Sequence, residues 1–168
     1  GVTIRIINEL NTATRTVIAG QADVALDMGV QQKLVADRVK GIVATTNPSL
    51  IFYGAFLNYS RPPLDDVRIR QALNYGINRD EINKVVNAGL GEPTCAVLPK
   101  ESWACDPATA NYYGHDPERA RKLLADAGHP DGIEIEAWGW PDQTAMTRQE
   151  LIMSQLAAAG IRLKLTAV

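Results

Sequence analysis

The sequence is poor in the residues and runs on which several specialised protein classes depend. Its 168 residues include two cysteines, two histidines and two phenylalanines. No apolar run approaches the roughly 18–20 residues that are needed to cross a bilayer. Lysine and arginine total 17 against 19 aspartates and glutamates, which leaves a net charge of −2. Because a general nucleic-acid binder needs an excess of basic residues, this balance disfavours that class and predicts no nucleic-acid partner.

The familiar catalytic and nucleotide-binding motifs are also missing. The sequence contains no GxGxxG, no GxxxxGKS or GxxxxGKT, no GxSxG and no HExxH. Each of these patterns places specific groups around a phosphate, an acyl carbon or a zinc ion. We therefore expect no cofactor, no metal site and no catalytic residues, and we predict that the protein is not an enzyme.

Two cysteines, Cys95 and Cys105, lie ten residues apart in the stretch CAVLPKESWAC. A structural zinc site takes four ligands, usually in closely spaced pairs, and His115 and His129 are the available additions. Both histidines flank expected helix ends, where solvated turn residues are common. We favour a disulfide between the cysteines, which indicates an oxidising compartment. Two free, partly buried thiols are the alternative.

Alternating and β-branched stretches predict strands in the first 57 residues. Such runs occur at residues 2–7, 23–26, 42–46 and 51–57. Between them, apolar residues at helical spacing predict helices over 11–19, with Thr12 as a candidate cap, and over 30–39. Strands and helices in turn indicate an α/β protein.

From residue 65 onward, helix-capping residues mark the starts of the predicted helices. The candidate caps, in chain order, are Asp65 or Asp66, Asn78 and Asp116. The stretch 91–111 carries three prolines and both cysteines, and we expect it to be irregular. After it, an alternating strand at 133–137, a helix ending at Gly160 and a strand at 161–166 predict a βαβ unit with parallel strands.

Aromatic residues supply the candidate binding residues. Trp138 and Trp140 follow the predicted strand at 133–137, and ligands of open α/β sheets bind beyond the carboxyl ends of strands. Two indoles there can form an apolar wall for a ligand; alternatively, one of them packs under the following loop. Tyr53 belongs to a second cluster, in which Phe52 and Phe56 are the better candidates for the core.

Several stretches together resemble one known family. LNYSRPPLDDVRIRQALNYGINRDEINKVVNAGLGEP resembles its signature of an asparagine at a strand end, a Pro-Pro turn, an Asp-Val-Arg-Arg-Gln-Ala helix and an Asp-Arg start to the next helix. YYGHDPERARKLLADAGHPDG, LIMSQLAAAGIRLKL and VIAGQADVAL resemble three further segments of the same family. The family is the solute-binding proteins of peptide-type ABC importers, which comprises the dipeptide, oligopeptide and nickel group.

The resemblance implies a fold and a place within it. The fold is the α/β periplasmic-binding-protein type (type II, cluster C), with a mixed sheet and flanking helices. Residues 1–50 resemble the end of the first lobe, and residues 51–168 resemble the hinge crossing and the first part of the second lobe. Members are several times longer and close two lobes around a ligand, so we expect this chain to be an internal fragment.

The resemblance also implies a function. It predicts a protein that captures short peptides, or a related small solute, and delivers them to ABC permease subunits in the membrane. The parent is then periplasmic or an extracellular lipoprotein anchored in the membrane. Near the hinge crossing, Tyr53 and Asn58 become candidate ligand-binding residues beside Trp138 and Trp140. The cysteine loop is not a general feature of the family.

Two other functions stay open at this point. A hydrolase could use a carboxylate pair drawn from Asp65, Asp66, Glu134 and Glu136, which requires two of them about 5–10 Å apart across a cleft. However, capping explains the aspartates and a solvated strand face explains the glutamates. The third possibility is an interaction module that dimerises through exposed faces.

Overall fold

The computed structural model describes residues 1–46, 52–94, 97–98, 102–110 and 112–167. The chain divides into two compact units, Gly1–Ser49 and Leu50–Val168, and each is described by itself. Their assignment to the first and second lobes of a binding protein stays a prediction.

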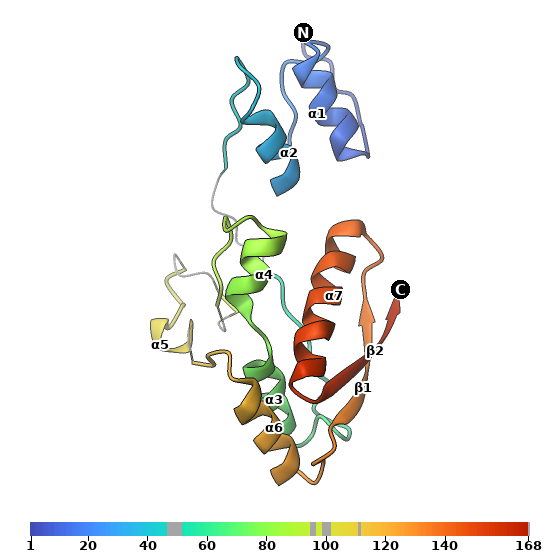
Figure 1. The fold of residues 1–168 in the computed structure, drawn as a ribbon. Coiled ribbons are helices and arrows are strands. Elements are labelled where there is room, and N and C mark those ends of the chain that lie inside the picture. Colours follow the sequence, from blue (N-terminus) through green and yellow to red (C-terminus); the bar gives the residue numbers. More distant parts are fainter. Residues whose placement is uncertain (47–51, 95–96, 99–101, 111, 168) are drawn as a thin grey trace. The chain divides into compact units, whose positions relative to one another are not determined.

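In its described residues, 1–46, the first unit contains two helices, α1 (Leu10–Ile18) and α2 (Val30–Ala36) (Figure 1). Glu9, rather than the expected Thr12, caps α1: its carboxylate accepts the backbone N–H groups of Asn11 at 2.9 Å and Thr12 at 2.6 Å. The Thr12 hydroxyl donates to the same carboxylate, and these bonds hold the pKa of Glu9 below its usual value. The first turn is therefore fixed by an acid at the positive end of the helix.

The four strands predicted in the first 57 residues are wrong as far as the structure describes them. Residues 2–7, 23–26, 42–46 and 52–57 form neither helix nor strand there, and residue 51 lies outside the described part. Val2, Ile4 and Ile6 are 91%, 85% and 90% exposed. Alternation of apolar and polar residues indicates which face a strand would bury. A strand forms, however, only when a neighbouring strand hydrogen-bonds to its backbone N–H and C=O groups. None of the described segments supplies that partner.

The second unit holds the remaining elements. In chain order they are α3 (Val67–Gly76), α4 (Arg79–Val86), α5 (Pro107–Ala110), α6 (Pro117–Asp126), β1 (Ile133–Gly139), α7 (Gln143–Ala158) and β2 (Ile161–Ala167). The predicted caps Asp66, Asn78 and Asp116 each accept a backbone N–H in the first turn of their helices. The predictions of these helix starts are confirmed.

The strands β1 and β2 pair in parallel across α7, which confirms the predicted βαβ unit. Ile133 lies opposite Ile161, and Ile135 opposite Leu163. Along β1 the buried residues alternate with exposed ones, so that Glu134, Glu136 and Trp138 share the outer face. The sheet therefore turns one face to the helices and the other to solvent.

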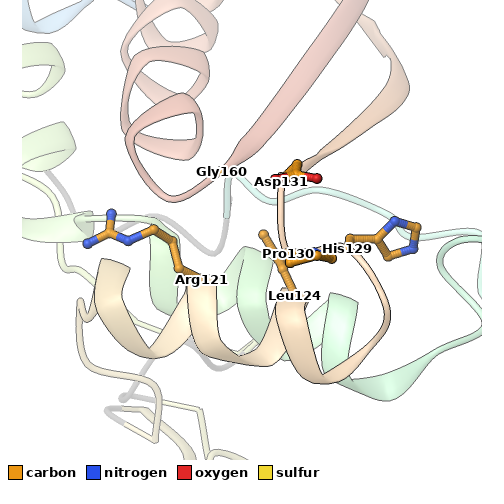
Figure 2. A pocket seen from close by; sticks show the side chains of 7 residues that line it. Arg121, Leu124, His129, Pro130, Asp131 and Gly160 are labelled. Atoms are coloured by element: carbon orange, nitrogen blue, oxygen red, sulfur yellow. The ribbon is translucent and has the colours of Figure 1, made fainter.

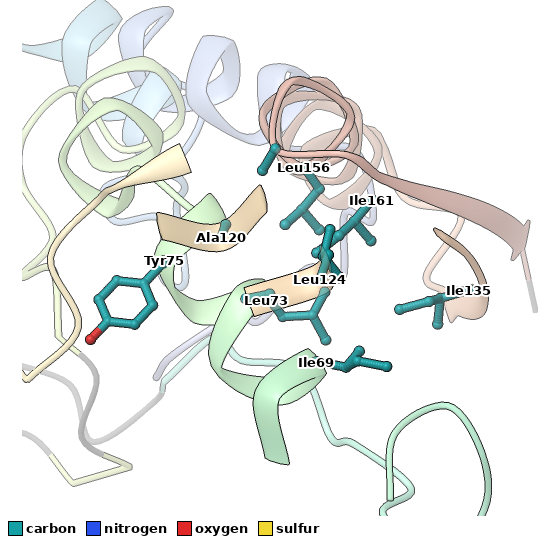
Figure 3. Packing of buried hydrophobic residues seen from close by; sticks show 10 residues of the cluster. Ile69, Leu73, Tyr75, Ala120, Leu124, Ile135, Leu156 and Ile161 are labelled. Carbon is teal, nitrogen blue, oxygen red and sulfur yellow. The ribbon is translucent and has the colours of Figure 1, made fainter. Parts of the chain in front are cut away.

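One hydrophobic core joins α3, α6, α7 and the sheet (Figure 3). Its largest fully buried side chains are Ile69, Leu124, Leu156 and Ile161. Helices α3 and α6 lie side by side (Figure 1). At the crossing of α3 and α7, a side chain on Gly76 would meet Leu156 at 2.9 Å, so glycine lets these helices approach closely. This core fixes α7 and β1, which carry the candidate site.

Candidate functional site

The candidate site lies at the turn between β1 and α7, beyond the carboxyl end of the strand. Asp142 begins α7 by accepting the backbone N–H of Ala145 at 2.9 Å. One turn further along, the side-chain amide of Gln149 donates to the carbonyl of Trp140 at 3.2 Å. A Cβ on Gly139 would lie 2.5 Å from that amide nitrogen. Helix α7 therefore packs closely against the turn, through the contacts of Gln149 with Gly139 and Trp140.

The two tryptophans of this turn are exposed. Trp138 is 67% and Trp140 74% accessible, so neither is packed under the following loop. Trp138 belongs to the solvent face of the sheet, and the carbonyl of Trp140 is held by α7. Large exposed indoles at a strand end are surfaces that a ligand can cover.

Tyr53 contacts the same helix. Its ring lies beneath the guanidinium of Arg148, with the carbon atom Cζ 3.9 Å from the ring centroid. The tyrosine is 69% exposed and the arginine is half-buried. A cation on an aromatic face at this distance is attractive by about 0.5–2 kcal/mol, and it ties the segment that precedes α3 to α7.

Asn58 has a local role in the structure. Its side-chain oxygen accepts the backbone N–H of Ser60 at 3.2 Å and the Ser60 hydroxyl at 2.6 Å. An asparagine that bonds two residues ahead in this way forms a turn. The oxygen is therefore engaged within the chain just before Pro62 and Pro63.

Two of the four predicted binding residues, Tyr53 and Trp140, contact neighbouring residues of α7. Tyr53 contacts Arg148, and Trp140 is bonded by Gln149. Trp138 lies on the outer sheet face and Asn58 in a turn. That the four together form a binding site stays a prediction.

Arg148 and Gln149 were missed by reasoning from the sequence. One signal was available for the arginine: no acidic residue stands three or four positions away from it on either side. Lys33 and Lys122, by contrast, pair with Asp37 and Asp126 four residues ahead. An arginine without such a partner on a helix is free to serve another group.

Three of the four carboxylates considered for hydrolysis, Asp66, Glu134 and Glu136, lie in positions that helix capping or strand pairing accounts for. Asp66 caps α3 and pairs with Arg68 at 2.5 Å, and the hydrogen bond from Arg68 lowers the pKa of this carboxyl to about 2. Glu134 and Glu136 stand opposite Arg162 and Lys164 in the parallel pair. These positions are a helix cap and a charged sheet face, as capping and alternation predicted.

Two small cavities lie away from this turn. The first, of about 160 Å³, lies between α6, the loop 129–132 and Gly160, near the amino ends of the strands. Figure 2 shows Arg121 and His129 at its rim pointing away from each other, so they do not converge on one anion. The second, of about 270 Å³, is lined by the start of α4 and by residues 92–94 and 113–115. Neither is lined by any of the four carboxylates considered for catalysis.

The predicted disulfide lies partly outside the described residues. Cys95 is not among them, and Cys105 is half-buried, so the pairing stays a prediction. In the described ranges, no three His, Cys, Asp or Glu side chains gather as they would around a metal ion. No helix of these ranges is long and apolar enough to span a membrane.

Comparison with known proteins finds relatives along the whole chain. The glutathione-binding protein GsiB of Shigella flexneri is 30% identical over 168 residues, which cover 99% of this chain and 33% of that protein. The dipeptide-binding protein of Pseudoalteromonas sp. SM9913, solved with Met-Leu, has a TM-score of 0.82 at 29% identity. The match covers 97% of this chain and 33% of that chain.

A more distant structure agrees in fold alone. DppA of Helicobacter pylori, solved with the peptide STSA, has a TM-score of 0.84 at 22% identity. The match covers 98% of this chain and 32% of that chain. These likenesses confirm the predicted α/β fold of the type II periplasmic-binding-protein class. The chain spans about a third of the length of the relatives that it matches.

The family model for bacterial extracellular solute-binding proteins, family 5, middle region, matches residues 1–168. This match covers every segment on which the resemblance was based. The chain therefore belongs to the family 5 extracellular solute-binding proteins of bacteria.

Proposed function

We propose that this chain is part of the solute-binding component of an ABC importer that captures short peptides. The observation that carries the proposal is the family match over all 168 residues. It is supported by the names of the relatives, which bind glutathione in one case and Met-Leu in another. Both ligands are small peptides with free carboxylates.

In this proposal, the exposed aromatic residues contact the solute. Tyr53, Trp138 and Trp140 offer flat apolar surfaces, and the backbone around the turn offers hydrogen bonds. Short peptides are recognised largely through their backbone and termini, while tolerant pockets accept varied side chains. Asn58 contributes indirectly, by shaping the turn that leads into α3. Ligand contacts from two lobes would stabilise a closed state, in the manner of a population shift.

The partners and location follow from the same proposal. The loaded protein delivers its solute to permease subunits in the membrane, and the protein acts outside the cytoplasm, either in the periplasm or as an anchored lipoprotein. An oxidising location of this kind is also where a bond between Cys95 and Cys105 would persist.

The proposal is tested by measuring dipeptide affinity with tryptophan variants of the natural protein at full length. Trp140→Ala and Trp138→Ala should weaken Met-Leu binding about 5- to 50-fold, because each removes a large contact surface. Trp103→Ala is the matched control, since Trp103 is 98% exposed in a different segment. Equal affinity for Met-Leu in all three variants would contradict the placement of the peptide at Trp138 and Trp140. Failure of the unmodified protein to bind any peptide would contradict the proposed function.

A hydrolase with a carboxylate pair is not supported. Asp66 is engaged by Arg68 and held ionised by its low pKa, which is unsuited to a general acid near neutral pH. Glu134 and Glu136 share an open sheet face with basic residues opposite. The geometry of these groups favours structural roles.

A further inference from the structure

We propose that the Asp131–Gly132 peptide unit is a site of spontaneous covalent modification, at which the chain rearranges to isoaspartate and loosens the start of β1. The two residues end the loop that joins α6 to β1, at the opposite end of β1 from the candidate binding turn. The inference goes beyond the proposed function and does not depend on which solute is bound.

The reaction joins the Asp131 side chain to the backbone nitrogen of the next residue. That nitrogen attacks Cγ of the protonated carboxyl group. The N–Cγ bond forms, the Cγ–OH bond breaks, and the hydroxyl leaves as water with the amide hydrogen, which gives a five-membered succinimide. Water then adds and opens the ring at the backbone carbonyl of Asp131, so that the chain runs through Cγ. The two steps release and consume one water and need no oxidant or cofactor.

The first argument is the residue that follows the aspartate. Gly132 has no Cβ, so no side chain crowds its nitrogen or the planar ring. In the whole sequence, Asp131 is the only aspartate or asparagine that a glycine follows. The sequence therefore singles out this position among all the residues that could form a succinimide.

The second argument is the freedom of the Asp131 side chain. The residue is exposed, and in the ranges that the structure describes no hydrogen bond or ion pair engages its carboxylate. Figure 2 shows this carboxylate apart from the side chains of Arg121 and His129. Because nothing fixes its rotamer, Cγ can turn toward the following nitrogen. Other aspartates of this unit are held by hydrogen bonds, namely Asp66, Asp106, Asp116, Asp126 and Asp142.

The third argument concerns the attacking nitrogen. The Gly132 N–H donates to the carbonyl of His129 at 3.1 Å, and this bond must break before the nitrogen can react. It closes a turn in which Pro130 and Asp131 are exposed. Turns of this kind open locally without unfolding of the domain. The modification therefore proceeds in the folded protein, at a rate that the opening of this turn sets.

The consequence follows from the close packing beside Gly132. Isoaspartate adds one methylene to the backbone directly before this glycine. A Cβ on Gly132 would lie 2.5 Å from the carbonyl oxygen of Gly160, so the backbones already touch. The same carbonyl accepts the N–H of Ile133 at 2.9 Å. The added length displaces this bond, with which the pairing of β1 and β2 begins.

The test follows isoaspartate in the full-length natural protein, kept folded at neutral pH for several weeks. Peptide mapping with electron-transfer fragmentation distinguishes isoaspartate from aspartate, which has the same mass. We expect several-fold more isoaspartate at residue 131 than at any other aspartate. Asp131→Glu should abolish it, because the longer side chain would have to close a six-membered ring, which forms far more slowly.

A matched control and a structural readout complete the experiment. Asp65→Glu is the control, since Asp65 is also exposed but an aspartate follows it; it should leave the modification at residue 131 unchanged. Hydrogen exchange at the Ile133 amide should be faster in the aged protein than in the fresh protein, and unchanged by ageing in Asp131→Glu. Thermal unfolding checks that each variant is folded.

The contradicting outcomes are distinct. A folded protein that forms no isoaspartate at residue 131, or no more there than at Asp65, overturns the inference, also where a urea-unfolded sample forms it. Modification with unchanged exchange at Ile133 overturns the loosening of β1. Each of these results leaves the proposed function standing, because peptide binding is measured separately.

Discussion

At the scale of single residues, Asp66 shows how one carboxylate can fix a helix start. It accepts the backbone N–H of Arg68 at 2.8 Å and pairs with the side chain of the same residue. Arg68 in turn donates to the carbonyl of Asp126 at the end of α6. A helix cap, an ion pair and a contact between two helices thus meet at Asp66.

This arrangement predicts a loss of stability in acid. The pKa of Asp66 is about 2 in the folded protein against an ordinary 3.8, so the unfolded chain binds its proton first as pH falls. The stabilisation is complete above about pH 4 and disappears as the pH falls through 2. Asp66→Asn keeps a capping side chain but removes the charge, and it should flatten the dependence of unfolding free energy on pH between 4 and 2.

Urea unfolding at a series of pH values measures this effect. Asp65→Asn, a change of the neighbouring carboxylate, serves as the control and should retain the slope of the unmodified protein. Identical slopes for the unmodified protein and Asp66→Asn would show that the Asp66–Arg68 pair does not stabilise the fold.

Gly132 is a second residue whose identity is dictated by its surroundings. Its φ is +92°, and a Cβ would lie 2.5 Å from the carbonyl oxygen of Gly160. Gly132→Ala therefore combines backbone strain of about 1–2 kcal/mol with a collision against backbone. Gly128→Ala is the matched comparison, because its φ is +94° but the space around it is open.

We expect Gly132→Ala to lower the free energy of unfolding more than Gly128→Ala does. Denaturant titration of the two variants measures the difference. An equal loss in both would mean that the close approach of residues 132 and 160 costs nothing beyond the backbone conformation.

At the scale of elements, α7 organises the second unit. Gln155 accepts the backbone N–H of Asn78 at 3.0 Å and donates to Glu81 at 2.8 Å, which ties α7 to α4. Leu156 packs in the core, while Arg148 and Gln149 of the same helix contact Tyr53 and Trp140 of the candidate site. The helix therefore couples the packing of the unit to the position of the binding residues.

This role predicts a large effect of truncating its core side chain. Leu156 is 1% exposed, and Leu156→Ala should cost about 2–5 kcal/mol of unfolding free energy, through lost burial and a cavity. Met146→Ala on the same helix removes a side chain that is 42% exposed and should cost under about 1 kcal/mol. Denaturation midpoints with unchanged slopes give both values; a loss of less than 1 kcal/mol for Leu156→Ala would contradict the described packing.

Helices were predictable from the sequence because their signals are local. Asp66, Asn78 and Asp116 lie within three residues of the N–H groups that they cap, and β1 and β2 flank a single helix. The predicted strand at 2–7 failed because its formation depends on a partner elsewhere, which alternation cannot reveal. Glu9 replaced Thr12 as a cap, since a longer acid can reach two N–H groups at once.

The candidate site was predictable to the extent that it follows a strand end. Trp138 and Trp140 were found because the carboxyl end of a strand in an α/β sheet is a general location for ligands. Arg148 was not found because Tyr53, which stacks on it, is distant in the sequence. Contacts of that range are set by the packing of several elements rather than by any local pattern.

At the scale of the whole molecule, the proposed function depends on family membership over the entire chain. The matched relatives are about three times longer, and the second unit carries its own core and an exposed aromatic turn. The chain is nearly balanced in charge, which suits a binding protein that recognises its solute through a few local groups. Dimerisation through exposed faces stays a prediction, and sedimentation at several concentrations would test it.

Native mass spectrometry of the gently purified full-length protein tests most directly whether it is a peptide receptor. We expect a bound mass that is released on activation and fragments as a short peptide with a free carboxylate. A released mass of a single compound without peptide bonds would contradict the peptide assignment. A protein that stays empty after growth in peptide-rich medium, and that takes up no added dipeptide, would contradict the claim that it is a peptide receptor.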